Sequence, residues 1–317
     1  MTAADDAPFH PGELEVQSRV GVREKIEAIG QRVIRDVMPE QHREFFTQLP
    51  FILVGALDAA GRPWASMLVG APGFITSPDP RSLHIAAQPL PGDPLADSLR
   101  VGADVGLLGI ELHTRRRNRL NGPIICADER GFSVRVAQSF GNCPKYINRR
   151  GYQFVERDPR RARARTLDRL DNHARALISN ADTFFIATHY GGAERSRSHG
   201  ADVSHRGGKV GFVRIDNERT LTWPDFVGNY LFNTLGNLQR NPQAGLMFPG
   251  FDSGDMLYVS GRGEIVWDGD EVSTYAGAQR LVRFRIERVV HSEATLPLQW
   301  QLEEYSPFLE PTGSWSG

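Results

Sequence analysis

The chain has 317 residues, of which 40% are hydrophobic and 24% are charged, and its formal net charge is −1. A chain of this length can bury one large core or two medium ones. The balance of acidic and basic residues argues against a nucleic-acid-binding protein, because such proteins normally carry a basic excess on at least one domain. The sequence has no apolar run near the roughly 18 residues that a membrane-spanning helix needs, so we expect no membrane association.

Two further features favour a cytoplasmic protein. The N-terminal residues Met-Thr-Ala-Ala-Asp-Asp are acidic and lack the apolar core of an export signal. The two cysteines, Cys126 and Cys143, are too few for a disulfide framework and fit a reducing compartment. Three histidines, His189, His199 and His205, lie in one region but not at the spacing of metal ligands, so the sequence predicts no metal site.

Residues 1–48 predict an N-terminal helical arm. Apolar residues such as Val22, Ile26 and Ile29 recur at three- and four-residue steps with charged residues between them, which is the pattern of an amphipathic helix. Pro39 is expected to interrupt this pattern, because proline cannot donate a hydrogen bond inside a helix.

Residues 49–156 predict a first β domain. The apolar runs 51–57 and 64–70 flank a short polar turn, which is the pattern of a β-hairpin. A short capped helix is expected at 92–99, and further strands follow it.

Residues 157–180 predict a charged helix that connects the first β domain to a second one over residues 181–317. Strand character resumes at 184–188, and a helix is expected from about residue 229 to residue 239.

The two β domains have the same order of parts, which indicates an internal duplication. The matching segments are 95–109 with 231–248 and 117–125 with 256–266, aligned on Gly122 and Gly261. Several short strands with one short helix per copy predict a mainly β fold with flanking helices, in which two tandem small barrels face each other. The long helices that a parallel sheet requires between its strands are missing.

Several common enzyme motifs are absent from the sequence. No G-x-G-x-x-G follows the first strand, no phosphate-binding G-x-x-x-x-G-K-[ST] loop occurs, and no G-x-S-x-G nucleophile turn is present. Dinucleotide-binding folds, P-loop enzymes and α/β-hydrolases are therefore disfavoured.

A first polar segment, residues 203–208, offers donors for an anion. Ser204, His205 and Arg206 precede paired glycines, so a hydroxyl, an imidazole and a guanidinium surround a backbone without side chains. This combination suits a phosphate monoester. An exposed hairpin whose polar side chains face water explains the same residues equally well.

A second polar segment begins where the strand ending at Trp223, Pro224 and Asp225 meets the expected helix. Asn233 and Thr234 lie near the start of that helix, where unpaired backbone N–H groups and the helix dipole favour a phosphate. The competing interpretation is simple N-capping by a side chain such as Asn229. Capping alone does not account for so many amide and hydroxyl side chains.

A third polar segment lies in the first β domain, after a basic strand. Gln138 and Ser139 could bond the edge of a heteroaromatic ring, while Cys143 beside Lys145 allows either a reactive thiol or a packed turn. On the strand itself, Arg117 could contact a phosphate or a ring, or could protect an exposed sheet edge.

Taken together, these segments resemble the pyridoxamine 5'-phosphate oxidase-like family of FMN-binding split barrels, and within it a bacterial subgroup with two barrels in one chain. The resemblance extends from about Phe9 to Trp315. It is carried by the stretches MPEQHREFFTQLPFILVGALDAAGRPWAS, TRRRNRLNG, AQSFGNCPKYI, SHRGG and WPDFVGNYLFNTLGNLQRNPQAGLMF.

The resemblance implies one FMN at the junction of the two barrels. The implied phosphate residues are Ser204, His205, Arg206, Asn233 and Thr234. The implied ring and ribityl contacts are Trp223, Pro224 and Asp225 with nearby Asn229 from one barrel, and Arg117, Gln138 and Ser139 from the other. In the first barrel the phosphate residues are replaced around Leu68 and Ser98, so the resemblance implies no second FMN there.

The resemblance also implies an FMN-dependent oxidoreductase that acts on an unidentified small-molecule substrate. Electrons would come from NADH or NADPH or from a separate reductase, and a homodimer is compatible with the family. The family's C-terminal Arg-x-His substrate signature is replaced by residues 298–304, which argues against oxidation of pyridoxamine 5'-phosphate itself. Two alternatives remain open: a flavin-binding or carrier protein without turnover, and a haem-binding split barrel with His205 as the axial-ligand candidate.

Overall fold

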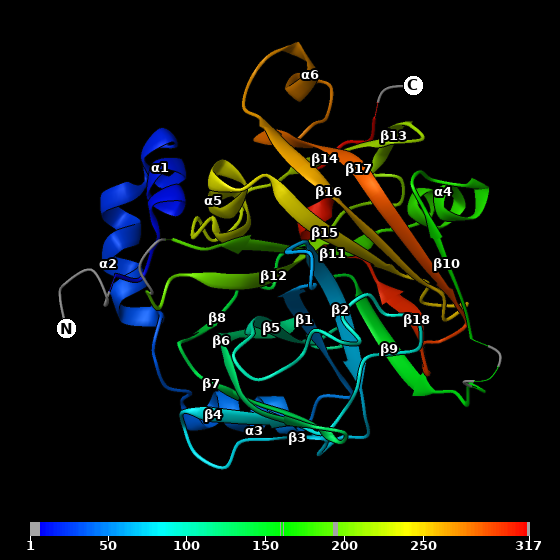
Figure 1. Cartoon of the computed structure of the whole chain (residues 1–317). Helices are drawn as coiled ribbons and strands as arrows, with labels where there is room; N and C mark the ends of the chain where they lie inside the picture. Colours follow the sequence, from blue (N-terminus) through cyan, green and yellow to red (C-terminus); the bar gives the residue numbers. More distant parts are fainter. Residues whose placement is uncertain (1–6, 159, 161, 193–195, 316–317) are drawn as a thin grey trace.

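The computed structural model describes residues 7–158, 160, 162–192 and 196–315. The chain is mainly β, with two antiparallel sheets of eight strands each, and Figure 1 shows the second sheet above the first. No helix in the described part of the chain is long and apolar enough to cross a membrane.

The N-terminal arm consists of three short helices. They are α1 (Pro11–Arg19), α2 (Arg23–Val33) and α3 (Glu40–Thr47). The first turn between them uses Gly21, whose φ of +71° is readily adopted only by glycine. The break before α3 falls at Pro39, as the sequence predicts. Phe45 and Phe46 of α3 are fully buried in the core of the first sheet.

The first sheet has the strand order β2-β1-β5-β6-β7-β4-β3, and β8 also pairs with β6. Its strands are β1 (Phe51–Leu57), β2 (Pro63–Val69), β3 (Ile75–Thr76), β4 (Ser82–Ile85), β5 (Asp104–Glu111), β6 (Arg116–Asp128), β7 (Gly131–Arg135) and β8 (Gln138–Gly141). The helix expected at 92–99 is wrong, because this segment forms turns. Its Asp93 carboxylate is drawn into the interior, where Ser66 and Tyr258 both donate to it.

The second sheet has the strand order β12-β11-β15-β16-β17-β14-β13, and β10 pairs with β17. Its strands are β10 (Arg163–Leu167), β11 (Thr183–Tyr190), β12 (Gly200–Gly207), β13 (Arg214–Asn217), β14 (Thr220–Asp225), β15 (Gln243–Pro249), β16 (Met256–Val266) and β17 (Arg280–Glu293). The order β12-β11-β15-β16 repeats β2-β1-β5-β6, which confirms the predicted fold class of two tandem barrels in one chain.

Three helices and a small sheet complete the molecule. The helices are α4 (Asn172–Ser179), α5 (Asn233–Arg240) and α6 (Asp270–Ser273), and the small sheet pairs β9 (Arg149–Phe154) with β18 (Leu298–Glu304). A single 3-10 turn follows at Pro307–Leu309. In Figure 1, α1 lies beside α5, so the N-terminal arm contacts the second barrel as well as the first.

The connecting helix expected over residues 157–180 is largely wrong. Among the described residues of this range the only α-helix is α4, while β10 runs antiparallel to the long strand β17. Arg165 of β10 forms ion pairs with Glu293 and Asp171. Arginines at alternate positions suit an exposed edge strand, and pairing with β17 overrides the helix propensity of the Arg/Ala-rich sequence.

The two sheets pack against each other with approximate two-fold symmetry. Their close approach depends on two glycines. A Cβ at Gly106 of β5 would lie 2.6 Å from the Cα of Asp202, and a Cβ at Gly245 of β15 would lie 2.6 Å from the Cα of Trp64. Gly106 and Gly245 occupy matching register positions, as do Trp64 and Asp202. The same registers match Gly122 with Gly261, as the sequence alignment predicts.

Candidate functional site

A cleft lies where β12, β14 and the start of α5 in the second barrel meet β6 of the first barrel. The loop after β8 and the loop before α5 close its sides. It is lined by Arg117, Arg119, Asn142, Lys145, Tyr146, Ser204, His205, Arg206, Gly207, Phe212, Pro224, Asp225, Phe226, Gly228, Asn229, Tyr230, Phe232, Asn233, Thr234 and Leu235.

Most of the residues singled out from the sequence lie in this cleft. They are Arg117, Ser204, His205, Arg206, Pro224, Asp225, Asn229, Asn233 and Thr234. They come from both halves of the chain, because Arg117 belongs to the first barrel and the others belong to the second. The structure therefore brings the first two polar segments together with the basic strand.

Three of the singled-out residues do not line the cleft. Trp223 is fully buried in the second core, edge-on to Phe184, because it and Pro224 point to opposite faces of β14. Gln138 donates to the carbonyl of Pro8 at 3.1 Å. Ser139 forms a backbone bridge to Arg35, so both residues hold the N-terminal arm rather than reach the cleft.

Four cationic side chains and one carboxylate line the cleft, although the chain as a whole is nearly neutral. Arg117 donates through Nε to the carbonyl of Cys143 at 2.7 Å, and Arg206 donates to the carbonyl of His205 at 3.1 Å. Within the described residues, neither Arg117, Arg206 nor Lys145 forms an ion pair. Their charges are therefore available to an anion.

The crowding of positive charge affects the arginines themselves. Burial lowers the pKa of Arg117 to about 9, and the charges of Arg119 and Arg206 add to this effect. Burial also lowers the pKa of Arg206, while the nearby Asp225 carboxylate opposes the shift. A bound anion would favour the charged form of both arginines.

Below these arginines lies a buried polar network that joins the two barrels. Arg119 of β6 forms an ion pair with Asp202 of β12 and donates to Ser204 Oγ at 2.7 Å. Thr234 of α5 donates to the same oxygen at 3.0 Å. Because both partners of the ion pair are almost fully buried, removing one would leave an uncompensated charge in the interior.

The start of α5 is open toward the cleft. Its N-cap residue, Phe232, has a φ of +63° and provides no side-chain hydrogen bond to the first turn. Tyr230 has a similar φ of +62°. Two non-glycine residues in this strained region turn the chain sharply into the helix. The first N–H groups of the helix, with the positive end of its dipole, therefore face the cleft without a side-chain cap.

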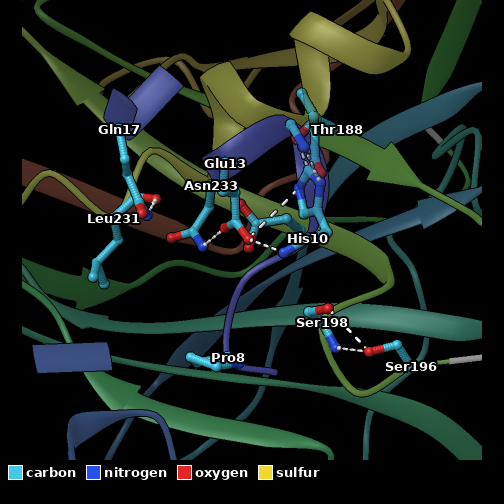
Figure 2. A network of polar contacts seen from close by, with 12 residues as sticks. Pro8, His10, Glu13, Gln17, Thr188, Ser196, Ser198, Leu231 and Asn233 are labelled. Carbon is cyan, nitrogen blue, oxygen red and sulfur yellow. Dashed lines mark hydrogen bonds and ion pairs between the residues drawn. The ribbon is translucent and has the colours of Figure 1, made fainter. Parts of the chain in front are cut away.

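The N-terminal arm reaches the same helix start through Glu13. Figure 2 shows Glu13 between His10 and Asn233, and its carboxyl accepts from the His10 backbone N–H at 2.9 Å and from the Asn233 amide at 2.5 Å. Burial raises the pKa of Glu13 to about 8, and burial lowers the pKa of His10 to about 3. Both side chains are therefore neutral near pH 7. The Asn233 amide, expected to face a phosphate, is instead held by Glu13.

Burial shifts the pKa values of two residues in the cleft wall, His205 and Asp225. Burial lowers the pKa of His205 well below its usual range, with the neighbouring arginines adding to the shift, so the imidazole is neutral. Its Nε2 atom is buried and has no hydrogen-bond partner in the part of the chain that the structure describes. Burial raises the pKa of Asp225, but the charges of Arg206 and Arg280 oppose this, and Arg280 lies 3.6 Å away.

The corresponding position in the first barrel has lost these features. The strand registers match Ser204, His205 and Arg206 with Ser66, Met67 and Leu68, and match Arg117 and Arg119 with Met256 and Tyr258. No arginine remains at these positions, and the space is occupied by the buried Asp93 carboxylate. A carboxylate in place of the arginines disfavours an anion at this position of the first barrel.

Comparison with known proteins gives only weak likenesses. No family model matches the sequence, and no curated protein matches it. Among solved structures, HupZ from Group A Streptococcus is 15% identical and aligns with 38% of this chain and 91% of its own, at a TM-score of 0.30. A proposed pyridoxamine 5'-phosphate oxidase from Lactobacillus delbrueckii is 16% identical over 39% of this chain and 98% of its own, at 0.30.

A third solved structure, a proposed 5-nitroimidazole antibiotic resistance protein from Bacteroides thetaiotaomicron, is 12% identical over 45% of this chain and 93% of its own, at a TM-score of 0.29. Likenesses of this size assign neither a family nor an activity to the chain. The functional argument therefore depends on the residues of the cleft.

Some residues of the site were not foreseen as site residues from the sequence. Arg119 shares a strand face with Arg117, so its two-residue spacing was a usable signal. Lys145 and Tyr146 follow Cys143 in the third polar segment, but nothing in the sequence indicated that they line the cleft. Glu13 had no local signal, since its partner Asn233 is 220 residues away.

Proposed function

We propose that the cleft binds FMN and that the protein is an FMN-dependent oxidoreductase acting on a small molecule. The observation that carries the proposal is the pairing of Arg117 and Arg206, which form no ion pair with any described residue, with the uncapped start of α5 in one cleft. A phosphate dianion is the ligand that this combination suits best, because charged guanidinium groups and helix N–H groups both bind it.

The phosphate would be held by Arg206 and by the first N–H groups of α5, because Thr234 already donates its one hydroxyl hydrogen to Ser204. Ser204 already accepts from Arg119 and Thr234, so its role is to fix the orientation of those donors. Asn233 acts in the same indirect way, because Glu13 holds its amide.

The rest of the cleft suits a flat, partly polar ring. Tyr146 and Phe226 lie with their ring centroids 5.0 Å apart and provide aromatic surface. Arg117 comes from the opposite barrel, and its charge would stabilise negative charge on a reduced ring more strongly in this partly buried site than in water. When bound, FMN would supply the redox chemistry, while the protein binds and orients the reactants.

The proposal is tested by comparing FMN with riboflavin, which lacks the phosphate. Arg206→Ala should weaken FMN binding by about 2–4 kcal/mol, the range for a lost charge-assisted contact, and should change riboflavin binding little. The exposed Arg130→Ala serves as a matched control, because it also removes one positive charge. Equal affinity of the parent and the Arg206→Ala protein for FMN, measured by flavin fluorescence, would refute the phosphate assignment.

Turnover requires a separate test, because a flavin carrier would show the same binding. The FMN-loaded protein is mixed anaerobically with NADH or NADPH, or with a candidate reductase, and flavin bleaching is followed. Bleaching that reverses when an electron acceptor is added supports an oxidoreductase. A flavin that no donor bleaches leaves the carrier function as the better description.

A haem-binding function is the second candidate, and one observation favours it. His205 lines the cleft as a neutral imidazole whose Nε2 has no hydrogen-bond partner. That atom is enclosed, however, with Phe185 against the ring, so axial ligation would require His205 to reorient. The absorption spectrum of the purified protein with each cofactor decides between the two, since a haem Soret band and flavin bands are readily distinguished.

A further inference from the structure

We propose that His173, Asp255 and His291 form a binding site for a divalent transition-metal ion in the second barrel. None of these residues lines the FMN cleft or was singled out from the sequence. His173 lies on α4, Asp255 lies in the loop before β16, and His291 lies on β17. The site therefore joins three segments that are well separated along the chain.

The three potential ligand atoms already surround one point. His173 Nε2 lies 3.2 Å from Asp255 Oδ2, and His291 Nε2 lies 4.0 Å from the same oxygen. All three atoms lie within 4.8 Å of one another. Ligands about 2.0–2.1 Å from a tetrahedral zinc ion are separated by about 3.4 Å, so only a small contraction is needed. His173 is half exposed on a short helix and can provide that movement.

The two less exposed residues of the group, His291 and Asp255, are positioned to bind a metal ion. The His291 side chain is 1% exposed, and its Nε2 has no hydrogen-bond partner among the described residues. A buried nitrogen without a partner is unfavourable unless something binds it. Asp255 is held in place because its Oδ1 accepts from the Ala294 backbone N–H at 2.8 Å. Its other oxygen, Oδ2, is thereby directed toward the two histidines.

Two residues near His291 Nδ1 affect coordination in opposite ways: Glu293 would support it, and Arg165 would oppose it. Coordination through Nε2 places the ring proton on Nδ1, and Glu293 Oε1 lies 4.0 Å from that atom as a potential acceptor. Arg165 Nη2 now lies 3.2 Å from Nδ1 and 3.1 Å from Glu293. Metal binding would therefore require the half-exposed Arg165 to turn away from His291.

The donor set selects the type of ion. Two imidazoles and one carboxylate suit zinc, cobalt or nickel, whereas calcium and magnesium prefer oxygen ligands alone. The exposed side of His173 leaves room for water as a further ligand. The competing interpretation is a His173–Asp255 ion pair beside an uninvolved His291.

The test uses the full chain without an affinity tag and follows the visible d–d bands of Co²⁺ as it is added. We expect one equivalent of Co²⁺ to produce the intense bands of a four-coordinate ion, and Zn²⁺ to abolish them. His173→Ala, a change at an exposed position, should weaken Co²⁺ by at least about tenfold, since even loss of a supporting outer partner costs roughly 10–100-fold. His113→Ala, at another exposed histidine, should change nothing.

A second variant separates a true site from general histidine binding. Arg165→Gln removes the competing guanidinium and should strengthen Co²⁺ binding while leaving the three ligands in place. Zn²⁺ should also raise the Tm of the parent but not that of His173→Ala, because only the folded parent presents the site. Absence of the four-coordinate bands in the parent, or equal Co²⁺ affinity of parent and His173→Ala, would overturn the proposal.

Discussion

Replacing Glu13 by glutamine should abolish the decrease in unfolding free energy that Glu13 causes as the pH rises from mildly acidic to mildly basic. Glu13 is 3% exposed, and burial raises its pKa from 4.5 to about 8. The folded state therefore holds a proton that the unfolded chain has already released. Because the folded state binds more protons in this interval, the unfolding free energy falls as the pH rises from 4.5 to about 8.

The size of the effect follows from the shift. One pKa unit corresponds to about 1.4 kcal/mol, so the rise from 4.5 to about 8 is worth up to about 5 kcal/mol over the whole interval. The unfolding free energy stops falling earlier if the N-terminal arm detaches from α5, because Glu13 then ionises in water. Glutamine has nearly the same size and keeps an acceptor for the His10 N–H but cannot ionise.

Other buried groups limit where this measurement is informative. His10 has a pKa lowered to about 3, so it contributes stability that is lost as the pH falls from 6.5 toward 3. Asp93 has a pKa raised to about 6, so its effect acts in the same direction as that of Glu13 but is complete near pH 6. Four further histidines, His42, His189, His205 and His291, also have lowered pKa values, so each raises the unfolding free energy slightly as the pH rises from 6.5 to 8. They act alike in the parent and in Glu13→Gln, so the difference between the two proteins, about 2 kcal/mol over this interval, reports on Glu13.

The assay is urea unfolding followed by tryptophan fluorescence at the two ends of that window. Between these two pH values the parent should lose about 2 kcal/mol more unfolding free energy than Glu13→Gln does. Glu15→Gln is the matched control, because Glu15 lies on the same helix but is exposed and pairs with Arg240. If the parent and Glu13→Gln lose the same free energy, Glu13 is not a protonated buried acid and the reasoning fails.

Three further outcomes are expected. The double variant Gln138→Ala/Ser139→Ala should lower the unfolding free energy by about 1 kcal/mol per lost hydrogen bond, since these residues hold the N-terminal arm. The absorption spectrum of bound FMN should stay unchanged, and a shifted spectrum would show that these residues contact the flavin ring. Gly245→Val should unfold the chain or greatly reduce its Tm in thermal melts, because a Cβ there would lie 2.3 Å from the Pro63 carbonyl oxygen. Gly141→Ala should cost far less, because a Cβ there would meet only Asn118 Oδ1 at 3.7 Å. A fragment of residues 180–317 should not bind FMN as the full chain does in a fluorescence titration, because it lacks Arg117, Arg119 and Lys145; equal affinity would contradict a cleft shared by both barrels.

The strands and the duplication could be predicted from sequence where the hydrophobic pattern was local. The hairpin of β1 and β2 and the alignment of Gly122 with Gly261 both depend on short-range pattern, and the structure confirms them. The segment 163–167 was predicted as helix because its Arg/Ala composition has helix propensity. Its strand conformation depends on pairing with residues 289–293, which no local pattern contains.

The candidate site was predictable to the extent that its donors are grouped in sequence. Ser204 and Arg206 lie on one strand, and Asn233 and Thr234 lie at one helix start, so their residue types already indicated an anion site. The position of Ser139 was not predictable, because its bridge to Arg35 spans two elements that are far apart in the chain. Sequence reasoning therefore located most of the polar residues that line the cleft but not which side chains support them.

The two barrels differ in the charge at matching positions, and this difference determines how many sites the chain has. Around Ser204 the second barrel receives Arg117 and Arg119 from the first, whereas around Ser66 the first barrel receives Met256 and Tyr258 from the second. Cations therefore line one of the two matching positions, and a buried carboxylate lies at the other. Since Arg117 and Arg119 come from the first barrel and Ser204 and Arg206 from the second, the cationic cleft needs both barrels. The first barrel therefore supplies a wall of the second barrel's cleft.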